Sequence, residues 1–162
     1  MARPNPVRAM MATELPPKTL QRRMPYRPSL DEVEYTYSIL NKYAFDNALH
    51  QPVIVLKQIP QAWGICFGLV EEDEYTGSNC RIRLSDKWFS TQWMVTTLAH
   101  EMCHQYQWDI NGPERAEHGK DWLMSHGPTF LEHRDRLSIY HVPLKVSHSK
   151  RLWFKHQDLF LA

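Results

Sequence analysis

The chain of 162 residues has few cysteines and no long hydrophobic run. Its three cysteines, Cys66, Cys80 and Cys103, are an odd number at scattered spacings, which argues against a disulfide framework and favours a reducing compartment. The N-terminal residues contain no apolar core of a signal peptide, and no segment approaches the ~18 apolar residues of a membrane span. We therefore expect a soluble, cytoplasmic protein without a membrane partner.

The chain also lacks a strong net charge. Its 19 Lys+Arg and 18 Asp+Glu give a formal net charge of +1, which argues against a protein that binds polyanions over its whole surface. Residues 1–28 nevertheless contain six basic residues and six prolines against one acid, which predicts a disordered basic arm. Residues 144–162 interleave basic and aromatic residues, a composition that fits a platform for single-stranded DNA or a terminal element packed on the body. These two segments make DNA a candidate partner.

Hydrophobic periodicity places one folded domain between the arm and the tail, over residues 29–143. A capping-box pattern at Ser29 and apolar residues at helical spacing predict a helix from about 30 to 48. A broad apolar stripe predicts a helix over residues 90–108. A second helix is predicted over residues 127–139, because Gly-Pro opens that segment. Runs rich in β-branched residues predict a small antiparallel sheet of about three strands: residues 53–59, 63–70 and 80–84.

The predicted helix over 90–108 carries the sequence His100-Glu101-Met102-Cys103-His104, an HExxH motif. Residues four apart differ by about 40° around a helix and lie ~6 Å apart along it, so two imidazoles can share one Zn²⁺ ion. Glu101, one residue after the first ligand, is placed to act as general base toward a water molecule. Cys103 turns toward the apolar row of the helix, and we expect it in the core.

These residues resemble the SprT-like metallopeptidases, the family that includes the DNA–protein-crosslink protease Spartan. The resemblance spans about residues 30–143 and includes Trp63-Gly64, the strand Arg81–Ser85, the HExxH helix and a downstream His-Gly-x-x-aromatic element. It implies an α+β, zincin-like fold in which a small antiparallel sheet packs beside the active-site helix and its flanking helices. The chain has no Cys-x-x-Cys pair, so it is similar to short stand-alone members of the family, such as those encoded by phages.

The resemblance implies one zinc ion, whose third ligand is the histidine that opens the His-Gly element. Two histidines compete for this role. His118 follows His104 by 14 residues, a loop length usual for the family, whereas His126 follows it by 22. Only His126 precedes a predicted helix, with Pro128 in the first turn, and Val142-Pro143 lies at the distance from it that the family leads us to expect. We predict His126 as the third ligand, with His118 as the alternative.

The resemblance further implies a zinc-dependent endopeptidase with Glu101 as general base. Its substrates would be proteins, including DNA-associated proteins. The substrate chain would lie extended along the sheet edge near Arg81, Ile82 and Arg83 and pair with it by β-augmentation. The alternative is a zinc-stabilised structural or binding module, such as a component of a larger particle, with little or no peptidase activity. Glu101 favours the enzyme, because a structural zinc site needs its ligands but no general base.

Overall fold

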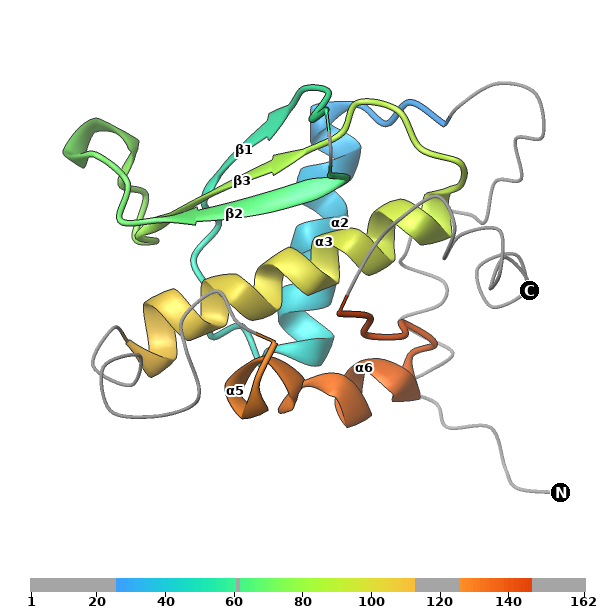
Figure 1. Cartoon of the computed structure of the whole chain (residues 1–162). Coiled ribbons are helices and arrows are strands. Elements are labelled where there is room, and N and C mark those ends of the chain that lie inside the picture. Colours follow the sequence, from blue (N-terminus) through green and yellow to red (C-terminus); the bar gives the residue numbers. More distant parts are fainter. Residues whose placement is uncertain (1–25, 61, 113–125, 147–162) are drawn as a thin grey trace, which may run out of the picture.

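A computed structural model describes residues 26–60, 62–112 and 126–146. Helix α3 (Thr91–Tyr106) runs through the middle of the molecule, with the sheet on one side and the short helices α5 and α6 on the other (Figure 1). The side chain of Ser90 caps the helix by accepting a hydrogen bond from the N–H of Trp93 (3.1 Å). Almost every residue of α3 is buried, because other elements pack around the helix on several sides.

The sheet has three strands in the order β1-β3-β2, with β3 at its centre. It is mixed, so the predicted all-antiparallel arrangement is wrong in one pair: β2 and β3 are antiparallel, but β1 and β3 are parallel. The chain reverses once between β1 and β2 and again between β2 and β3, which returns β3 to the direction of β1. Because β3 inserts between the other two strands, it lies beside a parallel neighbour. The strands are β1 (Val53–Leu56), β2 (Gly64–Gly68) and β3 (Cys80–Leu84).

The central position of β3 corrects one expectation about the substrate. Arg81, Ile82 and Arg83 were predicted to lie at a sheet edge, but β3 is paired on both sides, with β1 and with β2. Its backbone groups are therefore engaged within the sheet and cannot receive a further strand. The edge strand that packs against α3 is β2.

Helix α2 (Leu30–Ala44) begins at the predicted cap, where the Ser29 hydroxyl accepts a hydrogen bond from the N–H of Glu32 (3.1 Å). It ends four residues earlier than predicted. The chain leaves the helix because Asp46 and Asn47 adopt positive φ angles of 55° and 57°.

The predicted helix over residues 127–139 is present as two short helices, α5 (Pro128–Leu131) and α6 (Arg134–Ile139). Pro128 lies in the first turn of α5, as the sequence predicted. Helix α3 stops at Tyr106 and continues as a π-helical turn, η2 (Gln107–Asn111), which contacts α5. Such turns commonly accompany functional sites.

The folded part extends slightly beyond the predicted domain limits. Tyr26 is buried, and its carbonyl accepts a hydrogen bond from the N–H of Trp88 (2.8 Å). Leu144 is buried as well. The remainder of the predicted arm and tail, residues 1–25 and 147–162, lies outside the described residues, so their disorder and their DNA contacts remain predictions.

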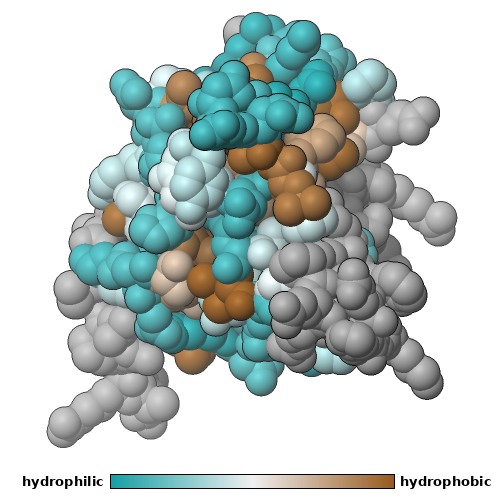
Figure 2. All heavy atoms as spheres, turned by 90° about the vertical axis from the view of Figure 1, so that its left-hand side faces the viewer, coloured by the Kyte–Doolittle hydropathy of each residue, from teal (hydrophilic) through white to brown (hydrophobic). Residues whose placement is uncertain are grey.

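Cys66, Cys80 and Cys103 are all buried, with free thiols. Among the described residues, no helix combines the length and the apolar character needed to cross a membrane. Several large hydrophobic residues are nevertheless exposed. On the face that carries the β2–β3 connection and the C-terminal end of α3, hydrophobic residues gather near the middle, between hydrophilic areas (Figure 2). The exposed large hydrophobic residues are Leu30, Tyr35, Phe67, Leu69, Tyr75, Ile110, Ile139 and Val146.

Candidate metal centre

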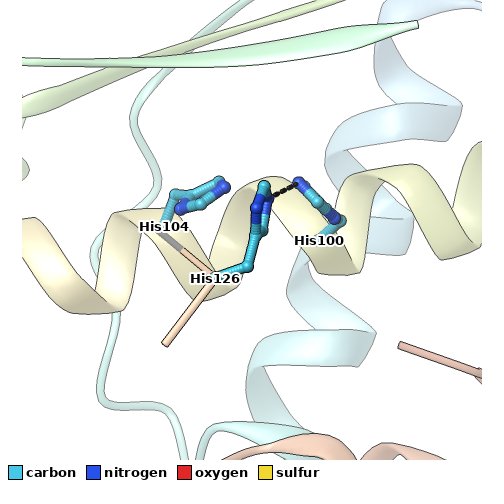
Figure 3. A group of neighbouring side chains, drawn as sticks. All are labelled: His100, His104 and His126. Atoms are coloured by element: carbon cyan, nitrogen blue, oxygen red, sulfur yellow. Dashed lines mark hydrogen bonds between the residues drawn. The ribbon is translucent and has the colours of Figure 1, made fainter. Parts of the chain in front are cut away.

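Three histidine side chains meet on one side of α3. His100 and His104 project from consecutive turns of the helix, and His126 reaches them from the segment that precedes α5 (Figure 3). One ligand nitrogen from each lies within 4.8 Å of the other two, and the Nε2 atoms of His100 and His126 are 3.3 Å apart. These three residues could hold a metal ion. His118, the alternative third ligand, lies outside the described residues.

Hydrogen bonds at Nδ1 determine which ring nitrogens face the centre. His100 Nδ1 lies 2.6 Å from the backbone carbonyl of Lys145. A carbonyl only accepts hydrogen bonds, so Nδ1 carries the proton and Nε2 keeps its lone pair. His104 Nδ1 lies 2.8 Å from Gln107 Oε1, whose amide nitrogen donates to Thr129 Oγ1 (2.9 Å). Both rings thus have the tautomer that a metal bound at Nε2 requires.

Burial keeps two of these imidazoles in the neutral form. It lowers the pKa of His104 to about 4, against a smaller opposite effect of the hydrogen bond with Gln107. Burial also lowers the pKa of His126. A neutral imidazole is the form that binds a metal ion.

Phe130 of α5 supports all three rings. Its ring centroid lies 4.8 Å from those of His100 and His104 and 4.7 Å from that of His126. Phe130 is fully buried, so the histidines rest on an apolar floor that restricts their rotation. Nothing in the sequence pattern predicts this role of Phe130.

We expect Phe130→Ala to lower metal affinity as well as stability. Truncation of a buried phenylalanine costs about 3–5 kcal/mol, and here it also frees the three rings. Leu137→Ala is the matched control, because Leu137 is equally buried on α6 but forms no part of the floor. Both variants should lower the melting temperature, while calorimetric zinc titration should detect weaker binding only for Phe130→Ala. Equal zinc affinity in the two variants would contradict the supporting role.

Gln107 offers a second test of the hydrogen bonds around the site. Gln107→Leu removes the acceptor of His104 Nδ1–H and should weaken zinc binding by about 10–100-fold. Gln107→Glu keeps an acceptor at this position and should retain most of the affinity. If competition with a chromophoric chelator gives the same zinc affinity for Gln107→Leu and wild type, Gln107 does not orient the ligand.

Glu101 lies between α3 and the edge strand β2. A Cβ added to Gly64 would lie 3.1 Å from Glu101 Cγ, a tight contact that would require neighbouring side chains to shift, so glycine suits the close approach of the strand to the helix. Burial raises the pKa of Glu101 to about 8, partly offset by a hydrogen bond from the backbone N–H of Cys66. Glu101 is thus a buried carboxyl group on the helix that carries His100 and His104, with one oxygen directed to the sheet edge.

The structure does not bring Arg81 and Arg83 to this cluster. Side chains alternate along β3, so the buried Ile82 faces α3 and the two arginines project from the opposite face. Arg81 forms a salt bridge with Glu74 (3.2 Å), and Arg83 donates to the carbonyl of Gln58 (2.9 Å). Their substrate-binding role remains a prediction without support from their position.

The donor set fits a metal centre of catalytic type. Three neutral imidazole nitrogens suit zinc, and three protein ligands leave a coordination position for water or substrate. A carboxyl group beside that position can move protons.

Comparison with known proteins gives a family match. No curated protein and no solved structure matches the chain. The sequence model of the SprT-like family matches residues 33–148, which include the edge strand β2, Glu101 and all three histidines of the cluster. The chain therefore belongs to the SprT-like family and carries a metallopeptidase-like domain.

Proposed function

We propose that the chain is a zinc-dependent endopeptidase whose zinc ion is held by His100, His104 and His126. The observation that carries the proposal is the convergence of these three side chains at a helix that also carries one buried carboxyl group, Glu101. When bound, zinc would supply Lewis-acid activation of a water molecule and of the scissile carbonyl.

In this proposal Glu101 is the general base. The positive charge of a bound zinc ion would favour the ionised form of Glu101, against the burial that raises its pKa. The Glu101 side chain reaches the Cys66 N–H of β2, so its carboxylate would lie beside a peptide bound along that strand. It takes the proton of the attacking water and passes it to the leaving amine, so one group serves both halves of the reaction. Burial of Glu101 keeps bulk water away from this proton.

We propose that the substrate lies along the outer edge of β2, with which no strand of the described residues pairs, instead of the position predicted on β3. The Ser85 N–H donates to the carbonyl of Trp63 (2.8 Å) just before β2 begins. Hydrogen-bonded and non-hydrogen-bonded pairs alternate in an antiparallel ladder, so the backbone groups of Gly64, Cys66 and Gly68 point away from β3. The hydrogen bond from the Cys66 N–H to Glu101 agrees with this direction. An extended peptide can pair by β-augmentation with the outward groups of this edge that Glu101 does not occupy, next to the proposed general base.

We further propose that the substrates are DNA-associated proteins, with DNA recruited by the basic residues of segments 1–28 and 144–162. The support for this is their composition alone. The experiment is cleavage of a histone by zinc-loaded protein, with and without single-stranded DNA. We expect cleavage that increases with DNA.

The outcomes separate the two candidate functions. Cleavage that does not respond to DNA would leave an endopeptidase without DNA recruitment. If zinc-loaded protein cleaves neither histone nor unfolded casein, the alternative of a zinc-stabilised structural or binding module is favoured.

A further inference from the structure

Leu69, the residue that follows β2, combines two unfavourable features. Its exposed fraction of 68% is the largest among the exposed large hydrophobic residues of the described chain. Its φ angle is +56°, in the left-handed region that leucine rarely adopts. Exposure of an apolar side chain and backbone strain both cost free energy, and strained residues cluster at ligand-binding sites.

Trp108 places Leu69 relative to the histidine cluster. It follows His104 by four residues on the continuation of α3, and residues four apart are neighbours on a helix surface. Trp108 also covers Gly68, because a Cβ added there would lie 2.1 Å from Trp108 Cε2. The indole thus lies between the last residue of β2 and the helical turn after His104.

Hydrogen bonds join the π-helical turn η2 to the connection between β2 and β3. Asp109, between Trp108 and Ile110, accepts hydrogen bonds from Ser78 Oγ (2.6 Å) and from the backbone N–H of Asn79 (2.9 Å). The carbonyl of Asn79 in turn accepts from the N–H of Val70, the neighbour of Leu69 (3.0 Å). The π-helical turn is therefore fastened to the β2–β3 connection.

We use the name Leu69 surface for Leu69 together with Trp108, which covers the preceding residue Gly68. The β2–β3 connection and the C-terminal end of α3 lie on the face shown in Figure 2, where hydrophobic residues gather near the middle. The Leu69 surface is continuous with the outer edge of β2 through Gly68. A peptide paired with that edge would run from Glu101, beside Gly64, to this surface.

We propose that the Leu69 surface is a specificity site that binds a large apolar side chain of the substrate. The proposal rests on the proposed peptidase function and on the substrate position along β2. A peptide paired with β2 rises about 3.3 Å per residue, as the strand does. The scissile bond would lie near Gly64 and the Leu69 surface begins at Gly68, so the selected side chain would be about three to four residues from the scissile bond. The substrate class is thus an extended polypeptide with a leucine, phenylalanine or similar residue at that distance.

The experiment uses zinc-loaded full-length protein and a peptide that it cleaves at one bond. Leucine and serine are compared at each of the four positions on either side of that bond. We expect wild type to prefer leucine at one position, three or four residues away, by about tenfold or more in kcat/KM, the usual gain from filling an apolar pocket.

Leu69→Asn should reduce this preference to less than about threefold, because asparagine tolerates positive φ without offering an apolar contact. Ile139→Asn is the control, since Ile139 is another exposed large hydrophobic residue (47%) but lies on α6. It should keep the wild-type preference. A wild-type enzyme that shows no preference at any position, or a Leu69→Asn variant that keeps it, would overturn the proposal.

A failure of peptidase activity can be told apart from a failure of the specificity site. If no peptide is cleaved, binding of the same fluorescent peptides to zinc-loaded Glu101→Gln is measured by anisotropy. Tighter binding of the leucine peptide that disappears with Leu69→Asn supports the surface even without catalysis. Equal binding of the leucine and serine peptides overturns it.

Discussion

Glu101→Gln is expected to lower kcat by at least about 10²–10⁴-fold while the protein still binds one zinc ion, because general acid–base catalysis contributes a factor of this size. Glutamine has nearly the same shape as glutamate and can still accept the hydrogen bond from the Cys66 N–H. It cannot take a proton from water. The measurement is single-turnover cleavage of a peptide, together with elemental analysis of the same preparation.

The melting temperature provides the control for this variant. Glutamine removes an ionisable group from a buried position, so we expect stability to stay the same or to rise. A variant that keeps both zinc and wild-type turnover would remove Glu101 from the reaction. A variant that unfolds or loses zinc would instead assign Glu101 a structural role.

His126→Ala is expected to abolish stoichiometric zinc binding, whereas His118→Ala should retain it. Removal of one of three protein ligands leaves two imidazoles, too few for a stable site. The Nε2 atoms of His126 and His100 are 3.3 Å apart, a distance at which both can bind one ion. Zinc content after dialysis against a weak chelator gives the comparison.

The reverse outcome would assign the third ligand to His118. Zinc retained by both single variants, and lost only when both histidines are replaced, would mean that either residue can complete the site. Such a result would contradict the assignment of a unique third ligand to His126.

The sequence predicted the elements better than their arrangement. β3 was predicted with its observed limits, because alternating burial from Cys80 to Leu84 is a local property of the strand. Its central position was not predicted, because strand order depends on how the chain reverses between strands. The end of α2 was also missed, since the turn depends on the positive φ angles of Asp46 and Asn47, which helical periodicity does not report.

In the candidate site, too, local features were predicted and contacts between distant parts of the chain were not. The HExxH spacing predicted the approach of His100 and His104, and Pro128 at the start of a helix favoured His126 over His118. The surrounding contacts were missed, because they join residues far apart in the chain: Lys145 O with His100, and the Phe130 floor under three rings. Gln107 could have been suggested by its position three residues after His104, the spacing of neighbours on a helix.

The central claim is that three histidines bind one zinc ion and leave a coordination position open beside Glu101. Anomalous diffraction at the zinc absorption edge tests it most directly, on crystals of zinc-loaded protein. The account predicts one anomalous peak about 2.0–2.1 Å from the Nε2 atoms of His100, His104 and His126, with no fourth protein ligand. A peak bound by His118, or one closed by a fourth side chain, would contradict it.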